Sequence, residues 1–495
     1  MQSSPSDTLS SGSLGRPLGN LEVFFKTLAD QGKPLKREHW TIHLAVTLEF
    51  PPSLRDPVPY LKCAWQVMRL RHPELEAFVC ADPNADDSVP RSRLVPGQLN
   101  LDAWTANTFV ILHQYSSADE VFSNLYATET PTCYWVPASS QLIIRASHWR
   151  TDGVGMALLG HDFMTALAAT MRQGLEPLTV ARALGWNSSY KEQDSFPRSL
   201  EEIARSQSCN PELHEVEEHP ILSAGANALV AEFLKGVPSI GLPTITNSET
   251  TTPSYSDRTS RTLKAVTTER ISSACREMGF TVTSAVHAAI IRATSSFPQH
   301  PLAKSYAAFV PVDLRQTLGD STGQAIGLYF SGLPVCIDST SLEEGPNTFE
   351  CIAQQLGSVY SRDHVRFWKR PDNGEYLSLL DLVQPYVKRT TVLFNTPVPE
   401  TFPLIQTPDL SSLGKVERYI QPKYPSESGR EVIKVADFWM GTEMLNRSIQ
   451  FHVWSWMGRL NLAACFNTSF YTKSFVAAVI DLTIEKLLEG CKVKE

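Results

Sequence analysis

The chain has 495 residues, of which 42% are hydrophobic and 19% are charged, and its formal net charge is -8 at pH 7. This composition is typical of a soluble globular protein, and the length predicts two or three domains. The negative charge disfavours nucleic acid and anionic membranes as main partners. The 9 cysteines are scattered and contain no CxxC pair, which indicates neither a disulfide framework nor a zinc site.

The sequence shows no signal for secretion or for insertion into a membrane. Residues 1–15 are rich in serine and contain no hydrophobic segment, which predicts a disordered leader and no secretory signal. No apolar run approaches the ~20 residues that a membrane span needs. We therefore expect a cytoplasmic protein.

Helices and strands are predicted to alternate along the first part of the chain. The amphipathic runs at 21–30 and 57–71 predict helices, and the second ends at His72-Pro73 because proline restricts the residue before it. Apolar or alternating runs predict strands at 40–50, 76–80, 108–113, 133–137 and 141–146. This alternation indicates an α/β or α+β class.

The chemistry is centred on one stretch, His148-Trp149-Arg150-Thr151-Asp152-Gly153-Val154-Gly155. A buried strand is expected before it and a mostly buried helix at 154–167 after it. His148 therefore lies in an irregular turn, where catalytic groups are often held, and its ring can accept a proton at cellular pH. The two glycines permit a sharp turn and bring backbone N–H groups within reach of a ligand.

Structural interpretations of the same residues stand beside the catalytic one. Asp152 either orients His148 or serves as the N-cap of the following helix. His148 alone is equally compatible with a histidine that packs in a core or loop. His161 and Asp162, inside the predicted helix, are expected to be packing or surface residues.

The middle of the chain has a different composition. Residues 187–262 carry acidic clusters and then a segment dense in Ser, Thr and Pro at 242–262, which predicts an extended, solvated connection. We expect an N-terminal half at 16–215, a crossover at 216–262 and a C-terminal half at 263–495. In the last of these, two helices are predicted at 267–294, a helix at 349–368 and one at 475–488; strands are predicted at 307–312, 326–337, 432–440 and 449–463.

A hydrolase and a binding protein are the competing interpretations. Gly319-Asp320-Ser321-Thr322-Gly323 matches GxSxG, but polar residues separate it from the preceding strand, whereas a nucleophile elbow needs the serine directly after one. A glycine-rich loop explains it better. A fold that only binds acyl chains or carrier proteins would not need both His148 and Asp152.

Six segments in order resemble the chloramphenicol-acetyltransferase-like superfamily, which includes plant BAHD acyltransferases and condensation domains, and within it the fungal trichothecene 15-O-acetyltransferases. They are RPLGNLEVFFKTLADQGKP with HWTIHLAVTLEF, RLRHPELEA, SHWRTDGVG, PVDLRQTLG with IGLYFSG, SSLGKVERYI, and DFWMG with WSWMGRLNLAACFNTSFY. SHWRTDGVG matches the HxxxDG signature of the superfamily. DFWMG departs from the BAHD motif DFGWG.

The resemblance implies two similar α/β halves with mixed sheets and helices around a central channel, with His148 at its middle as general base. It implies direct acyl transfer from acetyl-CoA as co-substrate to a hydroxyl of a secondary metabolite such as a trichothecene-like sesquiterpenoid, by a monomer that needs no metal or tightly bound cofactor. The alternative is a carrier-protein-bound donor whose acyl chain releases or esterifies a polyketide.

The resemblance also assigns structural residues near the site. Asp152 and Gly153 would shape the turn, with Asp152 paired to Arg315, and backbone N–H groups around Gly153 would stabilise the oxyanion. Asp437 and Gly441 of DFWMG would fix the junction of the halves, with Asp437 a buried, paired carboxylate whose loss costs about 3–5 kcal/mol.

Overall fold

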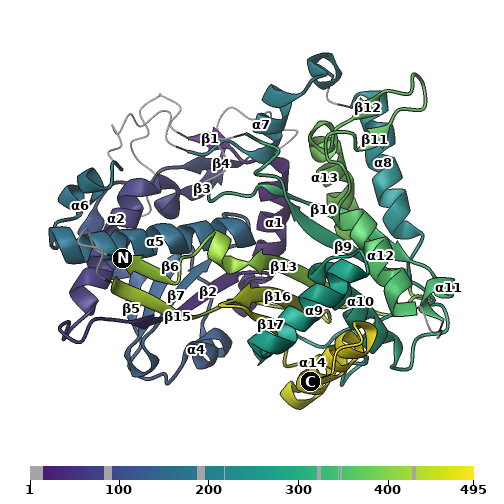
Figure 1. Cartoon of the computed structure of the whole chain (residues 1–495). Helices are drawn as coiled ribbons and strands as arrows, with labels where there is room; N and C mark the ends of the chain where they lie inside the picture. The colour runs from purple at the N-terminus through teal and green to yellow at the C-terminus, as the bar shows by residue number, and fades with distance from the viewer. Residues whose placement is uncertain are drawn as a thin grey trace.

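The structure is a computed structural model that describes residues 15–82, 92–186, 196–216, 218–319, 325–343, 345, 348–425 and 431–494. It has two halves side by side, each with a sheet and covering helices, which confirms the expected α/β class (Figure 1). Two hydrophobic cores correspond to the halves, and α1 (Asn20–Gln31) packs its Leu21, Phe24 and Phe25 into the core of the second half.

A six-stranded sheet with strand order β14-β15-β2-β7-β6-β5 forms the N-terminal half. Its strands are β2 (Ile42–Glu49), β5 (Phe109–Ile111), β6 (Thr132–Val136), β7 (Gln141–Ala146), β14 (Lys423–Pro425) and β15 (Glu431–Thr442). Two of these strands come from near the end of the sequence. The chain therefore returns to complete the sheet of the first half, and β15 pairs antiparallel with β2.

Helices and a small sheet surround this six-stranded sheet. They are α2 (Val58–Arg71), α3 (Leu101–Thr108), α4 (Ala118–Asn124), α5 (Gly153–Gln173) and α6 (Pro177–Ala183), with β1 (Arg16–Pro17), β3 (Phe78–Ala81) and β4 (Ser92–Val95). Among the described residues, α5 is the one helix long and apolar enough to cross a membrane, but 72% of its most apolar window is buried inside the protein. Its composition is explained by packing against α2 and β2.

A four-stranded sheet with order β13-β16-β17-β8 forms the centre of the second half, and β9 (Tyr306–Asp313) and β10 (Phe330–Ile337) pair beside it. The strands are β8 (Ser256–Thr262), β13 (Asp409–Lys415), β16 (Gln450–Trp456) and β17 (Arg459–Asn467). The predicted strand at 449–463 is thus two strands. Met457 and Gly458 have φ of 48° and 74°, which fits a two-residue hairpin turn.

Helices surround the strands of the second half in Figure 1, and α9, α10 and α14 lie against the four-stranded sheet itself. The surrounding helices are α7 (Leu200–Gln207), α8 (Pro220–Leu234), α9 (Ala265–Glu277), α10 (Val282–Ser295), α11 (Ser339–Leu342), α12 (Thr348–Tyr360), α13 (Leu379–Asn395) and α14 (Lys473–Gly490), with the short strands β11 (Trp368–Lys369) and β12 (Tyr376–Leu377). No helix was expected at α13, which contains Pro385.

The connecting region differs from the expected solvated linker. It contains α7 and α8, and the polar residues 256–262 form β8, which pairs along its length with β17. Ser256 and Arg258 lie on one face of β8 and are buried, whereas Asp257 and Thr259 on the opposite face are only partly buried, so this strand needs few apolar side chains. The division of the chain into halves at 215 and 263 remains a prediction.

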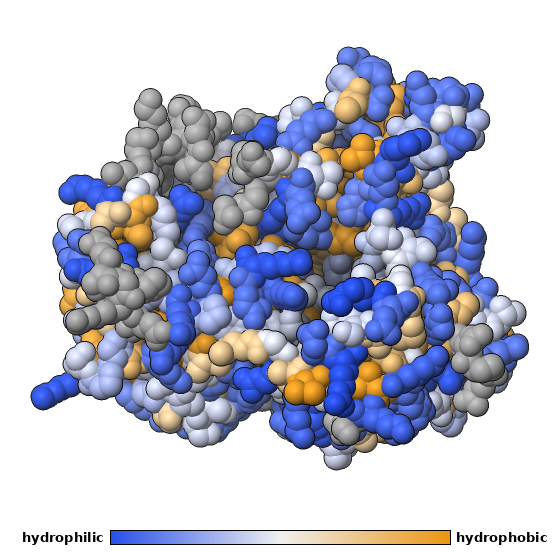
Figure 2. All heavy atoms as spheres, viewed as in Figure 1, coloured by the Kyte–Doolittle hydropathy of each residue, from blue (hydrophilic) through white to orange (hydrophobic). Residues whose placement is uncertain are grey.

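Hydrophilic residues predominate on the face of the molecule shown in Figure 2. A hollow lies near the middle of this face, where β9, β10 and β13 are seen in Figure 1, and apolar residues gather above it. The two halves thus meet at a depression in the surface.

Candidate active site

His148 lies in the six-residue connection between β7 and α5, as the sequence predicted. Residue 146, at the end of β7, pairs with Ile42 of β2, and Ile42 pairs in turn with Thr442 of β15. The Ser147 hydroxyl donates a hydrogen bond to the buried Glu38 carboxylate at 2.8 Å. The residue just before His148 is therefore fixed by both strand pairing and a buried polar contact.

Aromatic rings enclose the His148 imidazole. Phe25 of α1 stacks on it with 4.2 Å between ring centroids and 9° between ring planes, and Phe330 of β10 lies at 5.7 Å. Trp40 meets it edge-on at 6.5 Å. Phe330 belongs to the second half, whereas His148 follows β7 of the first. His148 therefore lies at the junction of the halves.

A cavity of about 40 Å³ opens beside His148. Its walls come from the six-stranded sheet, the four-stranded sheet and the start of α5; they are formed by Ile42, His148, Gly153, Ser411, Leu413, Met440, Thr442, His452, Val453 and Trp454. Ligand pockets usually measure about 300–1,000 Å³, so an acceptor would need side chains to move. The site is polar at four places, namely two imidazoles and two hydroxyls.

Burial keeps both histidines of this cavity neutral. It lowers the pKa of His148 to about 4 and that of His452 to about 3, the latter helped by the nearby Arg258 cation. His148 Nδ1 is buried without a hydrogen bond in the described structure, whereas His452 Nε2 lies 3.2 Å from the Thr442 hydroxyl. At neutral pH, a ring nitrogen of His148 can thus accept a proton.

Asp152 is turned away from His148 and caps α5. Its Oδ1 accepts a hydrogen bond from the Gly155 N–H at 2.7 Å, and its Oδ2 accepts one from the Tyr329 N–H at 2.8 Å. Arg315 meets both carboxylate oxygens at 3.0 Å. The Asp152 and Arg315 side chains are both buried, so a charged pair, flanked by backbone donors, connects α5 of one half to Arg315 of the other.

The two glycines of the motif have different roles. A Cβ on Gly155 would lie 2.3 Å from the Ile326 carbonyl oxygen, which no side chain permits. On Gly153 it would meet Leu413 and Met440 at 3.6 and 3.8 Å, which is ordinary contact. The close approach of α5 to the Ile326 backbone therefore requires glycine at position 155, while Gly153 lies on the cavity wall. The Gly155 N–H is already engaged by Asp152.

The expectation that Asp437 is a buried, paired carboxylate is wrong. Asp437 is exposed, and the described residues give its carboxylate no ion pair. The β15 register shifts between Val435 and Asp437, and this bulge changes which residues face outward. Partial desolvation raises the pKa of Asp437. Gly441, by contrast, is buried, and a Cβ there would lie 3.0 Å from Cys465 Sγ.

We accordingly expect Asp437→Ala to leave the unfolding temperature within about 2 °C of wild type. A raised carboxyl pKa in the folded state means that the ionised form does not stabilise the fold above that pKa, so nothing is lost at pH 7. Thermal unfolding followed by circular dichroism checks this. A fall of 6 °C or more would restore the view that Asp437 has a buried partner.

The other sequence candidates lie away from the cavity. His161 Nδ1 is 3.0 Å from the Tyr424 hydroxyl and Asp162 Oδ2 is 2.8 Å from His72 Nε2, which fits packing roles. Ser321 of the GxSxG segment lies outside the described residues. Four residues around His148 were not candidates from the sequence, namely Phe25, Ser411, Thr442 and His452. Phe25 and Ser411 lie inside the segments quoted above and Thr442 directly follows DFWMG, but no local pattern distinguishes them.

No family model matches the chain. A protein of Epichloe uncinata named loline biosynthesis cluster 1 transcription factor lolU1 is 28% identical over 97% of this chain and 95% of its own. Acetyltransferase pigO of Monascus ruber is 25% identical over 99% of both chains, and O-acetyltransferase pigM of the same organism is 26% identical over 95% of this chain and 84% of its own.

Solved structures agree on the fold. The trichothecene 15-O-acetyltransferase TRI3 from Fusarium sporotrichioides superposes with a TM-score of 0.75 at 16% identity, covering 98% of this chain and 99% of that one. The epimerization domain of tyrocidine synthetase B gives 0.55 at 13% identity, covering 98% and 99%. The chain thus has the fold of a trichothecene acetyltransferase and of an epimerization domain, and it is similar over nearly its whole length to two fungal proteins named as acetyltransferases.

Proposed function

We propose that the chain transfers an acetyl group from acetyl-CoA to a hydroxyl of a small fungal secondary metabolite, a trichothecene-like sesquiterpenoid being the first acceptor to test. One observation carries the proposal: a neutral histidine, held between a strand and a helix, lies in a cavity walled by the sheets of both halves. The names of pigO, pigM and TRI3 support acetyl as the group, and the trichothecene in the name of TRI3 supports the choice of acceptor.

His148 acts as the general base in this reaction. As the acceptor oxygen attacks the thioester carbonyl carbon, its proton passes to a ring nitrogen of His148, a step worth about 10²- to 10⁴-fold. The tetrahedral intermediate then expels the thiolate of CoA, which takes the proton back. Both substrates are held together, so no acyl-enzyme forms and proximity lowers the barrier. Aromatic rings around His148 suit an apolar acceptor.

The oxyanion of the intermediate needs hydrogen-bond donors on the cavity wall. Ser411 and Gly153 both line the cavity, so we take the Ser411 hydroxyl and the Gly153 N–H, in the first turn of α5, as the candidate donors; a helix N-terminus also favours negative charge. Gly155 contributes through its engagement of Asp152 rather than through a free N–H.

Ser411→Ala should lower kcat by about 10-fold or more with little change in KM, because a donor to the oxyanion acts in the transition state. The neighbouring Ser412 offers a matched control, since its hydroxyl lies 3.0 Å from the Thr283 hydroxyl and does not line the cavity. Ser412→Ala should keep wild-type turnover. Equal losses in the two variants would contradict a role for Ser411 in the oxyanion site.

A thiol-release assay tests the proposed function. Purified protein is given acetyl-CoA with a panel of apolar alcohols that includes trichothecene-type sesquiterpenoids, and free CoA is followed with a thiol reagent. Release should depend on the alcohol. Radiolabelled acetyl-CoA should leave no covalent label on the denatured protein, and retained label would show a ping-pong mechanism instead. Activity only with a carrier-protein thioester would favour the alternative donor.

The name of the Epichloe relative gives the main competing assignment, transcription. A net charge of -8 opposes binding to the phosphate backbone of DNA, which contributes much of the affinity of such proteins. Binding to DNA would not require a buried histidine beside a cavity such as that at His148. Our proposal therefore follows the acetyltransferases, and alcohol-dependent CoA release decides between the two.

A further inference from the structure

Two cysteines that are far apart in the sequence meet beneath the C-terminal end of the described chain. Cys275, in the last turn of α9, and Cys491, directly after α14, have their Sγ atoms 3.8 Å apart. Both are buried, at 1% and 3% exposure. A separation of 216 residues hides this pair from any sequence pattern, so the fold alone brings the thiols together.

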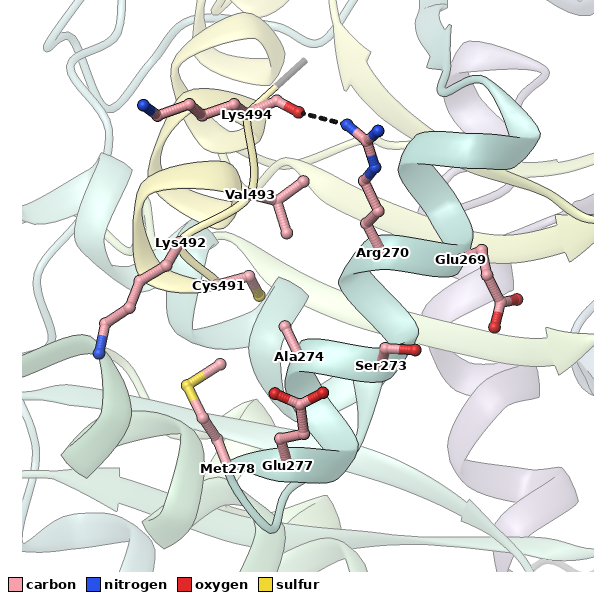
Figure 3. Close-up of a pocket in the computed structure, with 10 residues that line it drawn as sticks. All are labelled: Glu269, Arg270, Ser273, Ala274, Glu277, Met278, Cys491, Lys492, Val493 and Lys494. Carbon is pink, nitrogen blue, oxygen red and sulfur yellow. Dashed lines mark hydrogen bonds between the residues drawn. The ribbon is translucent and has the colours of Figure 1, made fainter.

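The surroundings of the pair allow an oxidant to reach it. Cys491 lines a surface cavity of about 660 Å³ together with residues of α9. Figure 3 shows Cys491 at the end of its helix with the sulfur directed toward the helix that carries Ala274. Arg270, Lys492 and Lys494 on the same wall supply positive charge, which favours a thiolate, beside the acidic Glu269 and Glu277.

The two sulfurs must move closer before a bond can form. A disulfide needs about 2.0 Å between sulfurs, so the two must approach by nearly 2 Å. Cys275 lies inside a helix, and the Cys491 N–H donates to the Leu487 carbonyl oxygen of α14 at 2.9 Å, so rotation of the two cysteine side chains must bring the sulfurs together. One hydrogen bond from Arg270 to the Lys494 carbonyl oxygen, at 3.2 Å, holds this end against α9 (Figure 3).

We propose that Cys275 and Cys491 are an oxidation site, which a hydroperoxide converts to a disulfide that ties the end of α14 to α9. One thiolate attacks the peroxide O–O bond, giving a sulfenic acid and, for hydrogen peroxide, water. The second thiol then displaces a second water, so two thiols and one peroxide give one disulfide and two waters. The hydrogen bond between the thiols lowers the pKa of Cys275. This site is independent of the proposed acetyl transfer.

Treatment of the full chain with hydrogen peroxide tests the proposal, in a C209S/C351S background that removes the two exposed thiols. Digestion without reductant should yield one peptide pair linked through Cys275 and Cys491, lost on adding dithiothreitol. The unfolding temperature should rise by about 5 °C on oxidation. C275S and C491S should each abolish both changes.

The parent chain provides the positive control, because peroxide must oxidise its exposed Cys209 and Cys351. If these react while no Cys275–Cys491 peptide forms, the proposal is overturned. Oxidation of either buried cysteine to a sulfinic acid without a link would overturn it equally. Peptide mapping needs no substituted cysteine in the pair, so the result holds even if C275S or C491S fails to fold.

Discussion

His148→Ala should lower kcat for acetyl transfer by about 100-fold or more while KM changes little. The imidazole is the proposed base, and its removal affects the transition state rather than substrate binding. The ring is partly buried among Phe25, Phe330 and Trp40, so its loss leaves the surrounding walls in place. Steady-state release of CoA with a responsive alcohol measures the effect.

Two controls keep this result interpretable. His161 lies further along α5, where it contacts Tyr424 away from the cavity. His161→Ala should therefore retain normal turnover. His452→Ala tests the second imidazole of the cavity. If His148→Ala stayed active and His452→Ala were dead, the base would be His452 and the proposed mechanism would be wrong.

The pH profile gives a second check on the same residue. A base must be unprotonated, and burial holds the pKa of His148 at about 4. The rate should therefore be constant between pH 6 and 8, with the acidic limb below about pH 5 rather than near the ordinary histidine value of about 6.5. An acidic limb near 6.5 would indicate that His148 is solvated in the free enzyme.

The position of His148 could be predicted from the sequence because its strand, turn and helix are adjacent in the chain. The apolar strand before His148 and the apolar helix after it have unmistakable periods, and the turn between them follows at once. The N-cap role of Asp152 was also available from its position before a helix. These features depend on residues within one stretch of about thirty positions.

Features that depend on distant strands were not predictable. The bulge in β15 exposes Asp437, although DFWMG by itself predicts a junction residue. Thr442 and His452 meet because β15 joins the first sheet while β16 stays in the second. Likewise, α13 was missed because Pro385 and polar residues weaken its pattern, while packing against α8 compensates.

The contact between Asp152 and Arg315 should be the strongest single link between the motif and the second half. Asp152→Asn should lower the free energy of unfolding by about 3–5 kcal/mol, because it leaves the buried Arg315 cation without its countercharge. Activity should fall with it, since Asp152 caps the helix whose first turn borders His148. Urea unfolding at pH 7 measures the loss.

A matched control comes from the same arginine. Asp313 also pairs with Arg315, at 2.8 Å, but its side chain is 28% exposed, so Asp313→Asn should cost about 1 kcal/mol or less. In the double variant Asp152→Asn/Arg315→Met the buried charge is gone, and the loss should be smaller than the sum of the single losses. Wild-type stability of Asp152→Asn combined with absent turnover would instead show that Asp152 acts on the substrate.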